Sequence, residues 1–137
     1  MDAFDADVLI YASIPGHELG QRVAALFPRG TRDVAGIGSV LLLPEVLRKP
    51  ARDGNSAMIR DLAGLLARLE LRPVDRTIAM LATMFAARYR LQAADAVHLA
   101  TAVTMGAKRF ITNNSRDFPR TITEIDITYP ADLPEAA

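Results

Sequence analysis

Apolar residues recur three or four positions apart in several parts of the chain, which is the spacing of one face of an α-helix. The clearest stretch is Ala57–Leu69, where leucines stand at positions 62, 65, 66 and 69. Asp75 is well placed to cap another such helix, and Gly106 is well placed to end one. The predicted helices cover His17–Phe27, Ala57–Leu69, Arg76–Arg88 and Ala93–Met105.

Short apolar runs separate these helices and predict β-strands. The run Val8–Ala12 is also apolar, and its periodicity favours neither a strand nor a helix. Short strands alternating with helices are typical of the α/β class, with a mostly parallel central sheet and helices on both faces. We therefore expect a three-layer α/β/α fold. The predicted strands are Met1–Phe4, Val34–Ile37, Leu71–Val74, Arg109–Thr112 and Ile125–Tyr129.

Proline and small polar residues indicate where these elements begin and end. Ser39 is a good N-cap for the apolar run that follows it. Pro44 either starts a new helix within that run or kinks one that begins at Ser39. Pro50–Ser56 and Asn113–Arg120 are predicted loops. We expect one domain over residues 1–130, followed by a loose C-terminal tail over residues 131–137.

The composition limits the chemistry that the chain can perform. Its 137 residues include no cysteine and only two histidines, His17 and His98. Disulfides, zinc–thiolate sites, iron–sulfur clusters, thiol nucleophiles and histidine-rich metal centres are therefore excluded. A bound metal would need oxygen ligands. The 16 Lys and Arg balance the 16 Asp and Glu, so nucleic-acid binding would need a local patch or a metal ion rather than a large positive net charge.

The sequence also predicts where the protein is located. The N-terminus carries Asp2 and Asp5 in place of the basic residues that begin a signal peptide. The longest uncharged apolar run, residues 35–44, is too short to span a bilayer. We therefore expect a cytoplasmic protein without membrane association.

Four acidic residues stand where this class of fold places functional groups. Asp5 and Asp117 follow predicted strands, and the carboxyl ends of the strands are the usual ligand-binding edge of an α/β sheet. Glu45 interrupts the apolar run LLLPEVL, and Asp95 stands at the start of a predicted helix. Three of these acids also have a purely structural explanation. Asp95 would be favourable near a helix N-terminus, and Asp117 could be an ordinary loop residue. A buried Glu45 could pair with Arg48.

The four acids together indicate more than any one of them does. Carboxylates that converge in one cleft repel each other, so at neutral pH they need a cation or a raised pKa. Oxygen ligands favour Mg²⁺ or Mn²⁺. Such an ion supports phosphodiester hydrolysis without a cysteine, a histidine or a covalent nucleophile. The acidic set is therefore a candidate metal-dependent nuclease site.

Four segments resemble the PIN domain family, and most closely its VapC-like toxin ribonucleases. They are FDADVLIYA, LPEVLRKP, LQAADAVHLATAVTMGA and RFITNNSRDF, and the resemblance extends from about Met1 to Tyr129. It implies a PIN-like fold with Val8–Ala12 in a helix. It also implies a Mg²⁺- or Mn²⁺-dependent endoribonuclease, the toxin of a type II toxin–antitoxin pair, with a small antitoxin partner and a homodimeric state. The metal site of the family maps onto Asp5, Glu45, Asp95 and Asp117, with Asn114 and Asp7 as further candidate ligands and Thr112 as a hydroxyl residue beside them.

Other residues are candidates for supporting roles. His98 lies three positions after Asp95, on the same helix face. It could be a ligand or a general base, and the simpler explanation is a packed or hydrogen-bonded histidine that supports the site. Candidate contacts to RNA phosphates are Arg48, Lys49 and Arg116, although each could be solvated surface charge.

Two further functions are compatible with parts of the sequence. A PIN-like fold could serve RNA binding or partner binding without catalysis, although the intact set of acids argues against such a loss. The DAD triplet after an apolar start is similar to the nucleophile motif of haloacid-dehalogenase-like phosphatases. That second alternative lacks support later in the chain, where Lys108 is the only lysine and no GDxxxD motif occurs.

Overall fold

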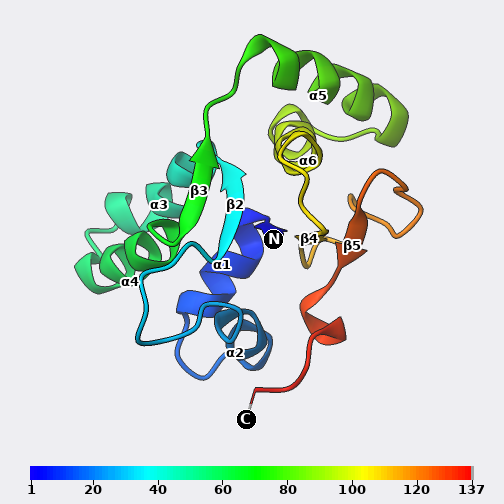
Figure 1. Cartoon of the computed structure of the whole chain (residues 1–137). Helices are drawn as coiled ribbons and strands as arrows, with labels where there is room; N and C mark the ends of the chain where they lie inside the picture. The colour runs from blue at the N-terminus through cyan, green and yellow to red at the C-terminus, as the bar shows by residue number, and fades with distance from the viewer. Residues whose placement is uncertain (137) are drawn as a thin grey trace.

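A parallel β-sheet forms the centre of the protein. The computed structural model describes residues 1–136. Its five strands lie in the order β3-β2-β1-β4-β5, and every neighbouring pair is parallel (Figure 1). The α/β class and the parallel sheet predicted from the sequence are therefore confirmed. The strands are β1 (Asp2–Phe4), β2 (Gly36–Ser39), β3 (Leu69–Arg72), β4 (Arg109–Ile111) and β5 (Asp126–Thr128).

Helices cover both faces of this sheet and make the predicted three layers (Figure 1). Ala3 and Phe4 are adjacent in β1 and point to opposite faces, as neighbours in a strand do. Phe4 packs in a core with α1 to α4, and Ala3 packs in a second core with α5 and α6. The helices are α1 (Ala6–Ser13), α2 (Glu18–Ala24), α3 (Leu42–Arg52), α4 (Ser56–Leu66), α5 (Arg76–Tyr89) and α6 (Ala93–Thr104).

The segment after β1 is helical, which decides between the two alternatives for Val8–Ala12. The carboxylate of Asp5 accepts a hydrogen bond from the backbone N–H of Ala6 and caps α1. α2 then packs closely against α1 at Gly20, where an added Cβ atom would lie 2.0 Å from the carbonyl oxygen of Tyr11. Only glycine permits this approach, so the local sequence sets how the two helices meet.

The structure corrects the sequence-based account of α3 at both ends. The helix begins after Leu41 and not at Ser39, which is the last residue of β2. Pro44 therefore lies in the first turn, where its missing N–H leaves no hydrogen bond unmade. The predicted loop Pro50–Ser56 is wrong over residues 50–52, which complete the helix. Pro50 is buried within the last turn, where its missing N–H leaves the carbonyl oxygen of Val46 without the usual intrahelical donor.

Two strand boundaries also differ from the prediction. β3 covers Leu69–Arg72 instead of Leu71–Val74, and β2 covers Gly36–Ser39 instead of Val34–Ile37. Pairing accounts for the difference, because Gly36 lies opposite Leu69 and Ser39 lies opposite Arg72 in one parallel ladder. Leu69 is buried in the strand as it would be in a helix, so its hydrophobicity alone does not distinguish the two.

The C-terminal segment is better ordered than its sequence predicted. A short 3₁₀ helix, η1, covers Pro130–Asp132, and Leu133 is buried with the core of α1 to α4. The loose tail expected from residue 131 is therefore wrong up to Leu133, because an apolar side chain here finds a place in the core. Residue 137 of that tail lies outside the described residues. None of the helices within residues 1–136 combines the length and the apolar character needed to cross a membrane.

Candidate functional site

The carboxyl ends of β1 and β4 bring the first acidic residues together. Asp5 directly follows β1, and Thr112 directly follows β4, its neighbour in the sheet. The hydroxyl of Thr112 donates a hydrogen bond of 2.8 Å to Oδ2 of Asp5, while Oδ1 accepts from the Ala6 N–H at 2.8 Å. Asp5 is only 5% exposed. Burial raises the pKa of Asp5 above its usual range, and the charge of His98 and the two hydrogen bonds oppose that effect.

Asp7 ties α1 to the loop after β4. Its Oδ2 accepts a hydrogen bond of 3.0 Å from the backbone N–H of Asn113, and its Oδ1 accepts one of 2.7 Å from that of Val8. Burial and the nearby charge of Asp5 raise the pKa of Asp7 to about 7. Both carboxylate oxygens are thus engaged with backbone donors, and Asp7 holds the loop after β4 against α1.

Glu45 and His98 join the two helical layers. Oε1 of Glu45, on α3, lies 2.6 Å from Nε2 of His98, on α6. The hydrogen bond from His98 is the main cause that lowers the pKa of Glu45, and the charge of Arg48 is a weaker one. The imidazole is therefore the principal partner of this carboxylate, in place of the Arg48 that the sequence suggested. His98 is buried and hydrogen-bonded, as expected of a supporting histidine.

Burial by itself would lower the pKa of His98. The hydrogen bond with Glu45 and the charges of Asp5, Glu45 and Asp95 outweigh burial and raise it. The other ring nitrogen, Nδ1, is buried and has no hydrogen-bond partner within residues 1–136. Within residues 1–136, the imidazole therefore makes its hydrogen bond to Glu45 through Nε2 and none through Nδ1.

Asp95 shows that the four acids share one electrostatic site. It lies in the first turn of α6 and is partly buried. Burial, then the charges of Asp5 and Asp117, raise the pKa of Asp95 to about 6, with a smaller contribution from Glu45. The charges of Asp5, Asp117 and Glu45 therefore all act on Asp95, which places the four acids in one region of the structure.

Asp117 is held by its own loop. Nδ2 of Asn114 donates to Oδ2 of Asp117 at 2.9 Å, and the Asp117 N–H donates to Oδ1 of Asn114 at 3.2 Å. The N–H of Asn114 in turn donates to the hydroxyl oxygen of Thr112 at 3.1 Å, and that hydroxyl contacts Asp5. A continuous chain of hydrogen bonds therefore connects Asp117 to Asp5, and the Asn114 amide serves this chain.

The donor set fits a hard divalent cation by charge and by atom type. Carboxylate oxygens of the kind that Mg²⁺ and Mn²⁺ prefer act on one another here, and burial together with this repulsion raises the pKa of Asp95. A bound cation would relieve that repulsion. Within residues 1–136, no three Asp, Glu or His side chains are already close enough to hold one ion together. The negative charges of the acids therefore act on one another in this structure, but within residues 1–136 their side chains are not arranged as the ligands of one ion.

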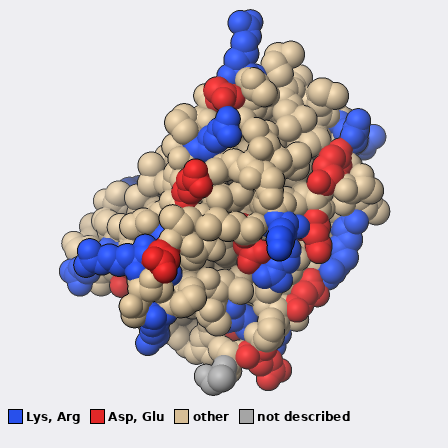
Figure 2. All heavy atoms as spheres, in the orientation of Figure 1, with Lys and Arg blue, Asp and Glu red and all other residues tan. Residues whose placement is uncertain are grey.

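The candidate RNA-contacting residues are exposed. Arg48 and Lys49 lie on α3 in the turn after Glu45, and Arg116 directly precedes Asp117. Figure 2 shows basic and acidic side chains interspersed on one face of the molecule, and neither sign covers that face alone. Contact with a nucleic acid would therefore depend on a few residues beside the acids, as the balanced net charge predicted.

Sequence reasoning missed two residues that contact the Asp117 loop, Tyr129 and Asp132. The hydroxyl of Tyr129 donates to the carbonyl oxygen of Phe118, and Asp132 pairs with Arg120. The sequence does contain a helix-start signal here, with a proline at the first position of η1 and an acid two residues later. That signal predicts η1 but does not reveal what η1 touches.

Comparisons with known proteins agree with the fold. The model of the PIN domain family matches residues 3–122. A chain of a solved structure described as a toxin–antitoxin complex from Klebsiella pneumoniae superimposes with a TM-score of 0.75 at 22% identity, covering 95% of this chain and 98% of that one. A search of curated proteins finds no significant match. The family match decides against the haloacid-dehalogenase-like alternative.

Proposed function

The chain belongs to the PIN domain family, whose members are typically nucleases, and we propose that it is a metal-dependent endoribonuclease. The observation that carries the proposal is the placement of the acids: Thr112 holds the Asp5 carboxylate where β1 and β4 end, and the charges of the other three acids act, together with burial, on Asp95. Such a concentration of negative charge destabilises a fold unless a bound cation neutralises it. A site for a divalent cation and a phosphodiester accounts for the presence of these acids.

We assign Asp5, Glu45, Asp95 and Asp117 to holding Mg²⁺ or Mn²⁺. When bound, such an ion supplies Lewis-acid chemistry for phosphodiester hydrolysis. Glu45 is oriented by His98. The other candidate ligands, Asn114 and Asp7, are engaged with Asp117 and with backbone N–H groups, so we assign them to holding the loop after β4.

Four further residues complete the proposed site. The hydroxyl of Thr112 is committed to Asp5 and orients that carboxylate. Arg48, Lys49 and Arg116 would hold RNA phosphates on either side of the cleaved bond. The products would carry a 5′-phosphate and a 3′-hydroxyl, as the family resemblance implies.

The biological role that we propose is that of a toxin neutralised by a small antitoxin protein. PIN domains resembling this one occur in toxin–antitoxin pairs, and the fold matches a chain of such a complex. In this role the protein would act on RNA in the cytoplasm and would form a homodimer. A small DNA-binding protein encoded immediately upstream would support the assignment.

The test is RNA cleavage by purified protein with Mg²⁺ or Mn²⁺, with EDTA, and with single substitutions. Cleavage should stop in EDTA and should fall at least 100-fold in Asp95→Asn, on the order expected for loss of a group that orients the reacting centre. Asp61→Asn is the matched control, because Asp61 is an exposed acid on α4. Undiminished cleavage in EDTA, or equal loss in both variants, would contradict the proposal.

One observation favours a second candidate, a PIN-like domain that binds RNA or a partner without catalysis. The acids are not yet arranged around a common ion position within residues 1–136. This candidate predicts RNA binding that survives EDTA and Asp95→Asn, with no cleavage under any condition. The same set of assays, read by gel shift as well as by product formation, separates the two functions.

A further inference from the structure

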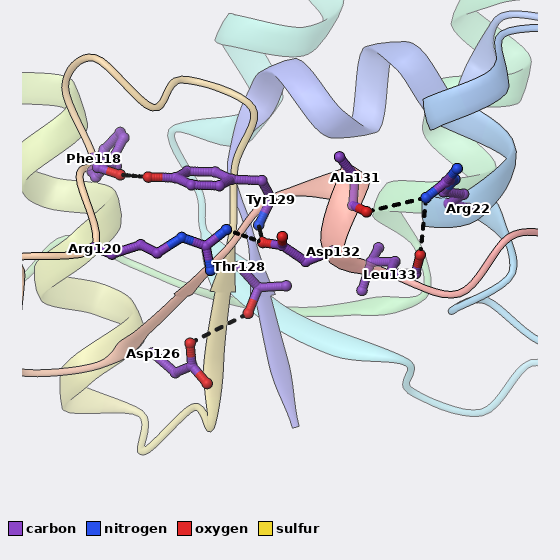
Figure 3. A network of polar contacts seen from close by, with 9 residues as sticks. All are labelled: Arg22, Phe118, Arg120, Asp126, Thr128, Tyr129, Ala131, Asp132 and Leu133. Atoms are coloured by element: carbon purple, nitrogen blue, oxygen red, sulfur yellow. Dashed lines mark hydrogen bonds and ion pairs between the residues drawn. The ribbon is translucent and has the colours of Figure 1, made fainter.

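We propose that the C-terminal clasp, residues Tyr129–Leu133, is a positioning device for Asp117, and that Tyr129 acts through the backbone of the Asp117 loop. The inference rests on the proposed function only in so far as Asp117 serves a metal site. The contacts by which the clasp holds the Asp117 loop do not depend on that function. Figure 3 shows the contacts that connect the clasp to the loop and to the rest of the molecule.

The first contact reaches the residue next to Asp117. The hydroxyl of Tyr129 donates a hydrogen bond of 2.7 Å to the carbonyl oxygen of Phe118 (Figure 3). The Phe118 side chain is fully buried, and its ring packs against Phe110 with centroids 5.0 Å apart. The peptide that follows Asp117 is therefore held on its backbone side by the clasp and on its side-chain side by the core.

The second contact holds the loop two residues further on. The Arg120 guanidinium lies 2.6 Å from Oδ2 of Asp132 and 4.6 Å from the centroid of the Tyr129 ring. The same Asp132 oxygen accepts a hydrogen bond of 2.9 Å from the Tyr129 N–H. Because Arg120 contacts both residues, it joins the end of the loop to the start of η1.

The clasp itself is anchored independently of the loop. Arg22, on α2, donates to the carbonyl oxygens of Ala131 and Leu133, each at 3.1 Å (Figure 3). The Leu133 side chain is only 3% exposed and lies in the core of α1 to α4. The clasp therefore connects the Asp117 loop to α2 and to the core of α1 to α4, and contacts outside the loop hold it in place.

Asp117 is consequently held between two anchors. On its N-terminal side Asn114 binds the Asp117 carboxylate and N–H, and on its C-terminal side the clasp holds Phe118 and Arg120. Removing the Tyr129 hydroxyl leaves the Asn114 contacts and the buried Phe118 ring in place. The fold should persist, while the carboxylate loses part of its restraint. Small misplacements at a reacting centre have large effects on rate, so such a residue acts by positioning.

The experiment compares Tyr129→Phe with Tyr89→Phe. The control removes the same hydroxyl from a partly buried tyrosine whose hydroxyl donates to Glu124, outside the acidic site. Amide hydrogen exchange of the metal-free protein reports on the Asp117 and Phe118 N–H groups, which both bond to Asn114. Mn²⁺ binding by calorimetry and RNA cleavage kinetics are measured on the same samples.

We expect exchange of the Asp117 and Phe118 amides to speed up about 5-fold in Tyr129→Phe, the factor for loss of one ordinary hydrogen bond. Mn²⁺ should bind about 5-fold more weakly, and kcat should fall while KM for RNA stays within about 2-fold. Tyr89→Phe should change none of these quantities. Asp132→Asn, at an exposed residue, removes the ion pair with Arg120 and should shift the same quantities in the same direction.

Equal exchange at Asp117 and Phe118 in both tyrosine variants would overturn the proposal. If Tyr129→Phe does not fold, Asp132→Asn is read by the same criterion against Tyr89→Phe. If the wild type neither binds Mn²⁺ nor cleaves RNA, the proposed function fails, and the exchange comparison still decides whether the clasp positions Asp117.

Discussion

Asp95 is destabilising to the metal-free fold when it is ionised. Its pKa is about 6 in the folded protein, above the value of about 4 for an unfolded aspartate, so ionisation costs folding free energy. The cost is absent below pH 4, grows as the pH rises to about 6, and is complete above that. Asp95→Asn should therefore stabilise the metal-free protein at pH 7.5, by on the order of 1 kcal/mol once solvent screening of this partly buried group is allowed for.

Thermal melts in EDTA at pH 4 and pH 7.5 check this prediction. The variant and the wild type should melt together at pH 4 and separate at pH 7.5, while the variant loses RNA cleavage. A lower melting temperature for Asp95→Asn at pH 7.5 would mean that the carboxylate is needed for folding, and would remove it from the proposed metal site.

Arg90 is the only residue other than glycine within residues 1–136 that has a positive φ, at 56°. It ends α5 in the left-handed conformation that glycine adopts without a steric penalty. Arg90→Gly should stabilise the fold by about 0.5 kcal/mol, which is the relief of strain less the greater freedom of glycine in the unfolded chain. Ala87→Gly, inside the same helix, should instead cost about 1 kcal/mol. Urea unfolding of both variants tests the contrast, and a shift of the same sign in both would contradict it.

Among the helices, α5 is the best candidate for the contact of the homodimer that the family resemblance implies. Met80 and Met84 lie one turn apart on α5 and are 62% and 58% exposed. Beside them an apolar groove of about 290 Å³ runs between α5 and α6, lined mainly by alanines. A two-fold dimer needs one self-complementary face, and this one is apolar and accessible.

We predict a dimeric mass at micromolar concentration for the wild type and a monomeric mass for the double variant Met80→Glu, Met84→Glu. The variant places a charge at each of two apolar positions and so opposes burial of the face. Light scattering measures both masses. Val34→Glu, at an exposed apolar residue outside α5, is the control and should remain dimeric. A monomeric wild type, or loss of the dimer in the control, would argue against α5 as the contact.

At the scale of the whole molecule, the acidic site should couple stability to both pH and metal. The pKa values of Asp5, Asp7 and Asp95 are raised, so the folded state binds more protons than the unfolded one between about pH 4 and pH 7. Stability of the metal-free protein should therefore fall as the pH rises through this window. The raised pKa of His98 changes the stability in the same direction, because the stabilisation that protonated His98 provides is lost as the pH rises.

Saturating Mn²⁺ should reverse this loss. A ligand that binds only the folded state adds about 2.7 kcal/mol at 100 times its dissociation constant. The rise in melting temperature should be larger at pH 7.5 than at pH 5, because protonated carboxyl groups bind cations poorly. It should vanish in Asp95→Asn and persist in Asp61→Asn. If Mn²⁺ does not change the melting temperature of the wild type at either pH value, the acids are not a metal site.

The elements of the fold were largely predictable, because they depend on short-range patterns. The caps Asp75 and Gly106 and the apolar spacing of α4, α5 and α6 lie within a few residues of what they control. Prediction failed where pairing or packing competes with local pattern. The ends of β2 and β3 follow a shared register, Pro50 is buried within the last turn of α3, and Leu133 packs in the core although its segment looks like a tail.

By itself the sequence determined the α/β class and the lack of sulfur ligands, and it singled out four acids as candidates, since residue type and spacing carry that information. Tertiary structure decided which groups act on them. Glu45 meets His98 from 53 positions away, Asp5 meets Thr112 from 107, and Tyr129 reaches Phe118 in a neighbouring loop. Such contacts have no period that a sequence can display. They depend on the order in which parallel strands lie in the sheet and on how helices from opposite faces pack at its carboxyl edge.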